Sequence, residues 1–216
     1  MKVIAFNGSP RKKWNTAMLL EKALEGAASQ GADTELFHLY DHNFEGCTSR
    51  FGCKIKGGKS YGKCVVKDDL VPILEMVEDA DAIIFGSPIY YGTASGEMRS
   101  FMERLMFPYL TYTDPMKSLF PKKINTGSIY TMNVTEEQMK EYGFNKHFDF
   151  NEMVLKIIFG ASESLYSFDT YQFKDYSKVV SDRFDPEKKA KRRKEVFLDD
   201  CEKVFEMGSR SSRKIK

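Results

Sequence analysis

The sequence predicts an α/β fold in which one parallel sheet carries helices on both faces. Two observations support this prediction. Short apolar runs alternate with segments of helical periodicity, and the first and third of these runs end abruptly in Gly, Ser and Pro. Such alternation is typical of βαβ units. We expect five strands in the order 2-1-3-4-5, an inserted loop at residues 40–67 and a C-terminal helical tail.

The expected strands are short apolar runs bounded by turn residues. They span residues 2–7, 33–39, 80–86, 123–133 and 163–170. The third run, Ala80 to Gly86, has the clearest strand character, and Ser87-Pro88 is expected to end it.

Helical periodicity is expected at residues 16–29, 95–107 and 185–208. Asn15 or Thr16 can cap the first helix, and Asp68-Asp69 opens a further one. We expect a single domain over residues 1–208. The basic segment 209–216 is expected to fray.

Composition excludes several classes of protein. The net charge of the 216 residues is only +2, which provides no strong field for nucleic acid or an acidic membrane. The basic run Lys188–Lys194 is flanked by acidic residues, so we expect a solvated helix face. No apolar run is long enough to span a membrane, and no secretory signal pattern is recognised. We therefore expect a cytoplasmic protein.

The segment Asn7–Thr16 directly follows the first strand and leads into a helix. Backbone N–H groups and the helix dipole favour an anion at such a place. Candidate ligands are the hydroxyls of Ser9 and Thr16, the amide of Asn15 and the guanidinium of Arg11. The spacing fits neither a Walker loop nor Gly-x-Gly-x-x-Gly. The alternative is an ordinary turn with a solvated Arg11.

A second motif, Gly86-Ser-Pro-Ile-Tyr-Tyr-Gly-Thr93, follows the third strand. In the expected strand order, strands one and three are neighbours and the topology reverses between them. Ligands of open α/β sheets bind in that crevice. We therefore expect both loops to face the same crevice between strands one and three. The alternative is a hydrophobic turn with Tyr90 and Tyr91 packed on a neighbouring helix.

These two loops, together with Met98-Arg99-x-Phe-x-Glu-Arg104, resemble the NADPH-dependent FMN reductase and iron–sulfur flavoprotein group. The resemblance covers residues 1–133 and implies a flavodoxin-like fold that binds FMN. It assigns the FMN phosphate to Ser9, Arg11, Asn15 and Thr16. It assigns the ribityl chain and the isoalloxazine ring to Pro88, Ile89, Tyr90, Tyr91 and Gly92. Thr131, with Met132 and Asn133, is expected near the edge of the ring.

The cysteines depart from the cluster pattern of the iron–sulfur flavoproteins, which have three cysteines at two-residue spacings and then a fourth. Here Arg50 stands between Cys47 and Cys53, and ten residues separate Cys53 from Cys64. Cys201 lies on the apolar stripe of the tail helix, where a buried structural thiol is expected. A [4Fe–4S] cluster normally needs four thiolates. We therefore expect no cluster and no metal; a zinc site with His42 as fourth ligand is the alternative.

The resemblance implies an oxidoreductase that moves a hydride from NAD(P)H through FMN to a small acceptor. Quinones, nitro- or azo-aromatics, flavins and ferric complexes are candidate acceptors, and no catalytic residue is assigned. The alternative is an FMN electron carrier that does not oxidise NAD(P)H. We also expect a homodimer or a dimer of dimers with residues 40–67 and 107–112 near the interface. Alternatively, helix 185–208 covers residues 107–112.

Overall fold

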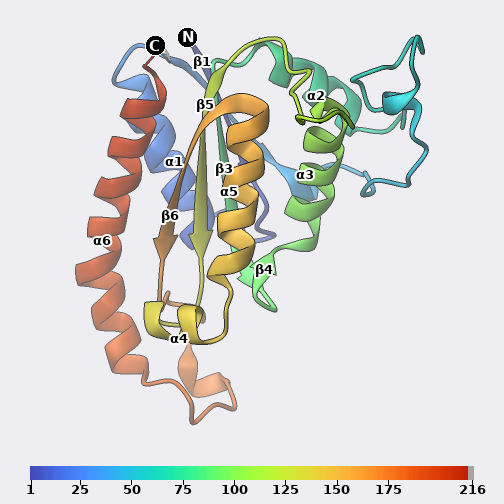
Figure 1. Cartoon of the computed structure of the whole chain (residues 1–216). Helices are drawn as coiled ribbons and strands as arrows, with labels where there is room; N and C mark the ends of the chain where they lie inside the picture. Colours follow the sequence, from blue (N-terminus) through green and yellow to red (C-terminus); the bar gives the residue numbers. More distant parts are fainter. Residues whose placement is uncertain (214–216) are drawn as a thin grey trace.

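The computed structural model describes residues 1–213 and contains a twisted parallel sheet between two layers of helices (Figure 1). The parallel strands follow the order β2-β1-β3-β5-β6. This is the predicted order 2-1-3-4-5. A sixth strand of two residues, β4, pairs antiparallel with β3. The strands are β1 Lys2–Asn7, β2 Asp33–His38, β3 Ala82–Tyr90, β4 Thr93–Ala94, β5 Ile124–Thr131 and β6 Gly160–Ser167.

The described part of the chain contains six α-helices. They are α1 Asn15–Ala28, α2 Leu70–Asp79, α3 Gly96–Tyr109, α4 Glu136–Glu141, α5 Asn145–Phe159 and α6 Pro186–Ser211. Helix α4 lies beyond the carboxyl end of β5, and the others cover the two faces of the sheet (Figure 1). Val3 and Ala5 of β1 pack with α1 and α6, whereas Ile4 and Phe6 pack with α2, α3 and α5. The alternation of side chains along a strand therefore builds two separate cores.

The ends of several strands differ from the sequence prediction. Strand β3 continues through Ser87 and Pro88 to Tyr90, although these residues were expected to end it. Its ladder with β1 finishes at Gly86, so a proline at position 88 interrupts no hydrogen bond to that neighbour. Strand β6 begins at Gly160 rather than at residue 163, because its register against β5 starts at Ile124.

Helices α1 and α6 lie side by side and run in the same direction along one face of the sheet (Figure 1). Their backbones approach closely at two glycines. A Cβ atom added to Gly208 would lie 1.7 Å from the carbonyl oxygen of Ala23, and one added to Gly26 would lie 1.9 Å from that of Phe205. Only glycine allows this contact.

The C-terminal tail is more ordered than expected. Helix α6 continues through Ser211, so residues 209–211 are helical rather than frayed; residues 214–216 lie outside the described part of the chain. The helix also lies on the face opposite to residues 107–112, which rules out the alternative that it covers them. Within residues 1–213, none of the helices combines the length and apolar character needed to cross a bilayer.

The insert at residues 40–67 projects beside α2 and α3 and contains the short 3₁₀ helices Leu39–Asp41 and Gly52–Lys54 (Figure 1). Two long side chains anchor it to α3. Lys54 donates to the carbonyl oxygens of Phe107 and Leu110 at the end of α3. Arg104 of α3 is 1% exposed and donates to the carbonyl oxygens of Glu45 and Val66.

Candidate cofactor-binding site

A cavity of about 110 Å³ lies at the carboxyl end of the sheet, where β1 and β3 separate. Eight of the ten predicted cofactor residues line it. They are Ser9, Arg11, Asn15, Thr16, Pro88, Ile89, Tyr90 and Thr131. The two loops therefore meet at the switch point of the strand order, as their positions in the sequence predicted.

The loop after β1 is shaped by its own short polar side chains. The carboxamide oxygen of Asn7 accepts from the Ser9 N–H at 3.0 Å, and the Ser9 hydroxyl accepts from the Arg11 N–H at 3.1 Å. These bonds turn the chain toward α1. Ser9 and Thr16 are both almost fully buried at the floor of the cavity, and the Thr16 hydroxyl lies 2.8 Å from that of Thr131.

The start of α1 is buried and has no side-chain cap. We expected Asn15 or Thr16 to cap the helix, but the cap position is Trp14, whose side chain makes no such bond. The N–H groups of Asn15, Thr16 and Ala17 find no acceptor among residues 1–213. Unpaired N–H groups at a buried helix start need a partner, and the helix dipole favours an anion there.

Arg11 supplies a cation beside this helix start. Its guanidinium lies 4.0 Å from the centre of the Trp14 ring and donates to the Gln172 carbonyl oxygen at 2.6 Å. Partial burial lowers the pKa of Arg11, and nearby Tyr90 opposes that shift; the group stays protonated in either case. Arg11 forms no ion pair with any carboxylate in residues 1–213. The donors and the charge fit a phosphate group.

One hydroxyl ties the two loops together. Ser95 caps α3, donates to the Gly8 carbonyl oxygen at 2.6 Å and places its own N–H 2.9 Å from the Ser87 hydroxyl oxygen. Gly8 is required here, because an added Cβ would lie 2.7 Å from that of Met98. The relative position of the loops is therefore fixed by packing and by buried hydrogen bonds.

Tyr91 and Gly92 do not line the cavity, in contrast to the other predicted residues. They form the two-residue turn between β3 and β4, with φ angles of +50° and +80°. Positive φ at both positions is typical of a type I′ hairpin turn. Tyr91 is fully exposed at its tip, and Gly92 packs under the ring of Phe144. The turn directs both residues away from the floor of the cavity.

The segment after β6 is a wall of the cavity that the sequence prediction missed. Thr170 and Gln172 line it, together with Trp14, Met132 and Asn133. The Tyr171 carbonyl oxygen accepts from the Trp14 indole N–H and from the Asn15 amide, both at 3.0 Å. No sequence pattern marks residues 170–172 as part of a site, because they act through their backbone.

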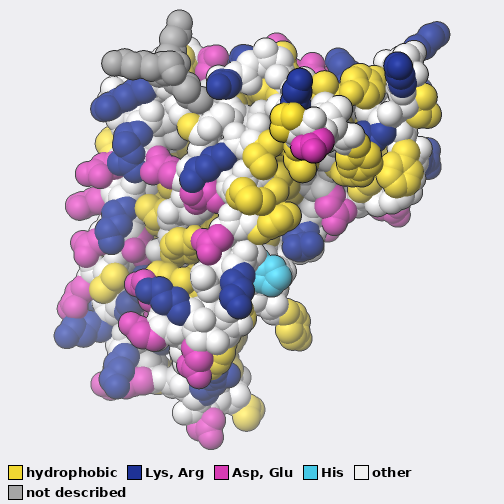
Figure 2. Space-filling model, in the orientation of Figure 1, with side chains coloured by type: hydrophobic (Ala, Val, Ile, Leu, Met, Phe, Trp, Pro, Cys, Tyr) yellow, Lys and Arg dark blue, Asp and Glu magenta, His cyan; other side chains and the backbone are white. Residues whose placement is uncertain are grey.

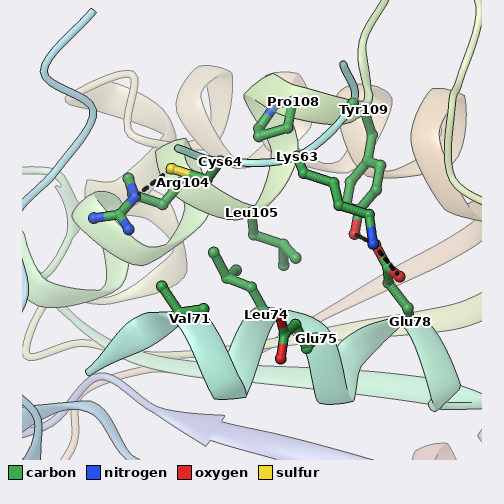
Figure 3. Close-up of a pocket in the computed structure, with 11 residues that line it drawn as sticks. Lys63, Cys64, Val71, Leu74, Glu75, Glu78, Arg104, Leu105, Pro108 and Tyr109 are labelled. Atoms are coloured by element: carbon green, nitrogen blue, oxygen red, sulfur yellow. Dashed lines mark hydrogen bonds and ion pairs between the residues drawn. The ribbon is translucent and has the colours of Figure 1, made fainter. Parts of the chain in front are cut away.

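A second cavity, of about 80 Å³, lies under the insert between α2 and α3 (Figure 3). At one end the Nε–H of Arg104 donates to the Cys64 sulfur at 2.9 Å, and at the other end Glu78 accepts from Tyr109 and Lys63. Apart from the exposed Glu75, the polar side chains that line it pair with one another. We therefore interpret this region as the contact between the insert and helices α2 and α3, and not as a cofactor-binding site.

The three clustered cysteines have different surroundings. Cys47 is exposed, Cys53 is buried and Cys64 contacts Arg104. Burial raises the pKa of the Cys53 thiol, with the charge of Lys54 opposing the shift. Within residues 1–213, no group of three or more Cys, His, Asp or Glu side chains is arranged to hold a metal ion.

Apolar side chains gather on the face formed by α3, α5 and the insert (Figure 2). A groove of about 580 Å³ runs across this face, and its aromatic residues are Phe51, Phe107, Tyr112 and Phe150. Of these, Phe51, Tyr112 and Phe150 are exposed. Tyr109, which belongs to the predicted stretch 107–112, is instead buried against Phe120 and Phe159.

Together, the doubly wound sheet and the cavity at its switch point define a protein of the flavodoxin-like class. Residues 1–129 match the family model described as NADPH-dependent FMN reductase, and the chain belongs to this family.

Two relatives are iron–sulfur flavoproteins of archaea. The chain is 40% identical to one from Methanocaldococcus jannaschii over 104 residues, which cover 48% of the chain and 51% of the relative. It is 38% identical to one from Archaeoglobus fulgidus over 104 residues, which cover 48% of each. The chain thus spans about half the length of the curated relatives that it matches.

Solved structures share the fold at low sequence identity. The NAD(P)H:quinone oxidoreductase of Methanothermobacter marburgensis has a TM-score of 0.71 at 15% identity, with 97% of this chain and 98% of the other covered. An FMN-dependent NADH-azoreductase from Bacillus anthracis, in complex with FMN, has a TM-score of 0.67 at 12% identity. The match covers 99% of this chain and 100% of the other. These similarities extend the shared fold beyond residue 129 to nearly the whole chain.

Proposed function

We propose that the protein is an FMN-dependent oxidoreductase that takes a hydride from NAD(P)H and delivers electrons to a small acceptor. The observation that carries this proposal is the buried, uncapped start of α1 in a cavity at the sheet switch point, with Arg11 beside it. Membership of the NADPH-dependent FMN reductase family supports the same conclusion.

In this proposal the phosphate of FMN is held by the loop after β1. The N–H groups of Asn15 and Thr16 donate to it at the helix start, the hydroxyls of Ser9 and Thr16 donate as well, and Arg11 supplies the cation. The Gln172 and Tyr171 carbonyl oxygens now accept from Arg11 and Asn15 respectively. A phosphate is a stronger acceptor for these donors than a neutral carbonyl group is.

The remaining part of the cofactor is assigned to the second loop. Pro88, Ile89, Tyr90 and Thr131 contribute apolar and hydroxyl surface to the cavity, and the hairpin turn at Tyr91 and Gly92 borders it. FMN supplies the hydride-accepting chemistry when it is bound, and the protein supplies binding, orientation and electrostatics. Tyr90 is about half exposed, so the side of the site that it borders is open to a second substrate.

The class of acceptor is proposed from the names of structurally similar proteins. These include an NAD(P)H:quinone oxidoreductase and an NADH-azoreductase. Both quinones and azo compounds are flat and conjugated, as are nitroaromatics and free flavins, whereas ferric complexes are not. We therefore propose a flat, conjugated acceptor in preference to a ferric complex.

Spectroscopy and steady-state kinetics test the proposal. We expect one FMN per chain, released on denaturation, and oxidation of NADH or NADPH in the presence of a quinone or an azo dye. Bound FMN without NAD(P)H oxidation would instead support the electron-carrier alternative. Failure of the folded protein to bind FMN would refute both.

We also propose that the clustered cysteines bind no iron–sulfur cluster, although relatives carry that name. Arg50 occupies the position of a ligand, and Cys64 already accepts a bond from Arg104. Iron and acid-labile sulfide should be near zero after anaerobic purification. A content of about four irons per chain would contradict this. We further propose a cytoplasmic location.

A further inference from the structure

Arg193 of α6 extends to the start of α1, near which Arg11 also lies. Its guanidinium donates to the Asn15 amide oxygen and to the Met18 sulfur. It lies 4.0 Å from the centre of the Phe197 ring and 5.9 Å from that of Trp14. The Trp14 ring is therefore close to both Arg11 and Arg193, which come from opposite ends of the sequence.

The surroundings of Arg193 leave its charge without an acidic partner. Its nearest groups are an amide oxygen, a thioether and two aromatic rings, and it forms no ion pair within residues 1–213. Burial lowers the pKa of Arg193; Cys201 opposes the shift and Arg192 adds to it. A partly buried cation without a carboxylate has lost some of its hydration without an ion pair to replace it, which is unfavourable. An anion bound at the start of α1 would offset that cost.

The contact between Arg193 and Asn15 also determines which way the amide faces. A guanidinium can only donate, so the oxygen of the Asn15 amide must face Arg193. Its NH₂ group is then directed to the other side, where it donates to the carbonyl oxygen of Tyr171, which lies in the chain between the cavity-lining residues Thr170 and Gln172. A reversed amide would present an oxygen to the cavity and would repel a phosphate.

We propose that Arg193 is a positioning residue for the phosphate group. It holds the Asn15 amide with its donor side toward the cavity and adds a second positive charge behind the loop after β1. This inference rests on the proposed FMN site, and it assigns to α6 a supporting part in that site. It predicts selectivity for a phosphorylated flavin over one without a phosphate.

The test is the affinity of the full-length apoprotein for FMN and for riboflavin, each measured by quenching of flavin fluorescence. Arg193→Met keeps the length and packing of the side chain but removes the charge. We expect this variant to bind FMN about tenfold more weakly, with riboflavin affinity unchanged. Lys194→Ala is the matched control: it removes one charge from the next, exposed position. It should leave both affinities unchanged.

Three outcomes would overturn the inference. The first is unchanged FMN affinity in Arg193→Met. The second is an equal loss of FMN and riboflavin affinity, which would indicate a general structural role. The third is an equal effect of Lys194→Ala. If the wild-type protein itself binds no FMN, the proposed function fails, and that result is distinct from all three.

A double-mutant cycle separates the two contributions of Arg193. If Arg193 acts mainly through the amide, Arg193→Met should weaken FMN much less in an Asn15→Ala background than in the wild type. Arg193→Lys restores the charge without the planar fork, so recovery in this variant measures the direct electrostatic part. If the losses of FMN affinity in Arg193→Met and Asn15→Ala are additive, Arg193 does not act through the amide. If Arg193→Lys also fails to recover FMN affinity, the charge makes no direct contribution either.

Discussion

Arg11 is the residue whose loss should most directly affect the proposed phosphate site. It lies at the start of α1, stacks on Trp14 and has no carboxylate partner in residues 1–213. We predict that Arg11→Ala weakens FMN binding by about 10- to 100-fold, because it removes a charge-assisted contact. Equilibrium titration of the apoprotein measures this change.

Lys13→Ala is the control for Arg11, since Lys13 is exposed in the same loop and carries the same charge. Its substitution should change FMN affinity little. If Arg11→Ala binds FMN with wild-type affinity, Arg11 is not a phosphate ligand, and the N–H groups at the start of α1 are the main ligands.

The ion pair between Arg104 and Asp68 should dominate the acid sensitivity of the insert. The two side chains form two hydrogen bonds, of 2.8 and 3.1 Å, and the Arg104 side chain is fully buried. Burial of Asp68 opposes its ionisation, but the bonds from Arg104 and from the Leu70 N–H outweigh it and lower its pKa. Stability from this pair is therefore present above about pH 4 and is lost as the pH falls through the lowered pKa.

Asp68→Asn tests this pair. We predict a loss of about 3–5 kcal/mol in the free energy of unfolding at neutral pH, because a buried guanidinium is left uncompensated. Urea unfolding at about pH 7, 5 and 3 should also show a weaker acid dependence in the variant than in the wild type. Asp69→Asn, a substitution of the exposed neighbour, should change little. Equal effects of the two would show that the pair contributes nothing specific.

At the scale of residues, the sequence predicted the side chains that belong to the two loop motifs and missed effects that depend on turn geometry or on contacts between distant segments. Ser9, Arg11 and Thr16 reach the cavity because the strand, the breaker and the helix follow one another directly. Tyr91 turns away because the hairpin requires positive φ there. Arg193 lies 178 residues from Asn15, so no local pattern could associate the two.

At the scale of elements, the glycine contact between α1 and α6 positions the start of α1. We predict that Gly208→Ala lowers the free energy of unfolding by about 1–3 kcal/mol, since the new methyl group would meet the Ala23 backbone rather than a flexible side chain. Weaker FMN binding should accompany this loss, because α1 must shift. Chemical denaturation and flavin titration of the same variant measure both effects.

Gly96→Ala provides the comparison. Gly96 begins α3, and a Cβ atom added there would meet no neighbouring group within 4 Å. Its replacement should be neutral or stabilising by up to about 1 kcal/mol. If Gly208→Ala behaves in the same way, the close contact of the two helices has no energetic importance.

The order and type of the main elements could be predicted from the sequence, whereas their exact ends could not. Apolar runs of period two and of helical period located the five parallel strands and the main helices. Strand β3 can continue through Pro88 because β1 stops pairing with it at Gly86. The position of that last pair depends on how the two strands align, and neither sequence segment shows it alone. The anchoring of the insert likewise depends on Lys54 and Arg104 meeting their partners across the fold.

At the scale of the whole molecule, the aromatic groove on the face of α3 and α5 predicts self-association. Phe51, Tyr112 and Phe150 are exposed there around a groove of about 580 Å³. Large exposed aromatic patches usually mark interfaces, and closed twofold symmetry is the commonest arrangement. We predict a homodimer or a dimer of dimers with a mass that is a multiple of the 24.9 kDa chain.

Phe150→Asp should shift this protein toward the monomer by placing a charge in the interface. Leu198→Asp makes the same change at an exposed position of α6, on the opposite face, and should leave the assembly intact. Light scattering at micromolar concentration measures both. A wild-type mass equal to that of one 24.9 kDa chain, with FMN bound and activity intact, would refute the assembly.

The span between Asn15 and Arg193 has a consequence during synthesis on the ribosome. The loop after β1 emerges first, and the guanidinium that orients its amide follows 178 residues later. At ordinary translation rates this delay is on the order of 10 to 40 seconds. A nascent chain would therefore hold FMN weakly until α6 has been made and docked, so tight flavin retention would mark chains whose translation has passed that helix.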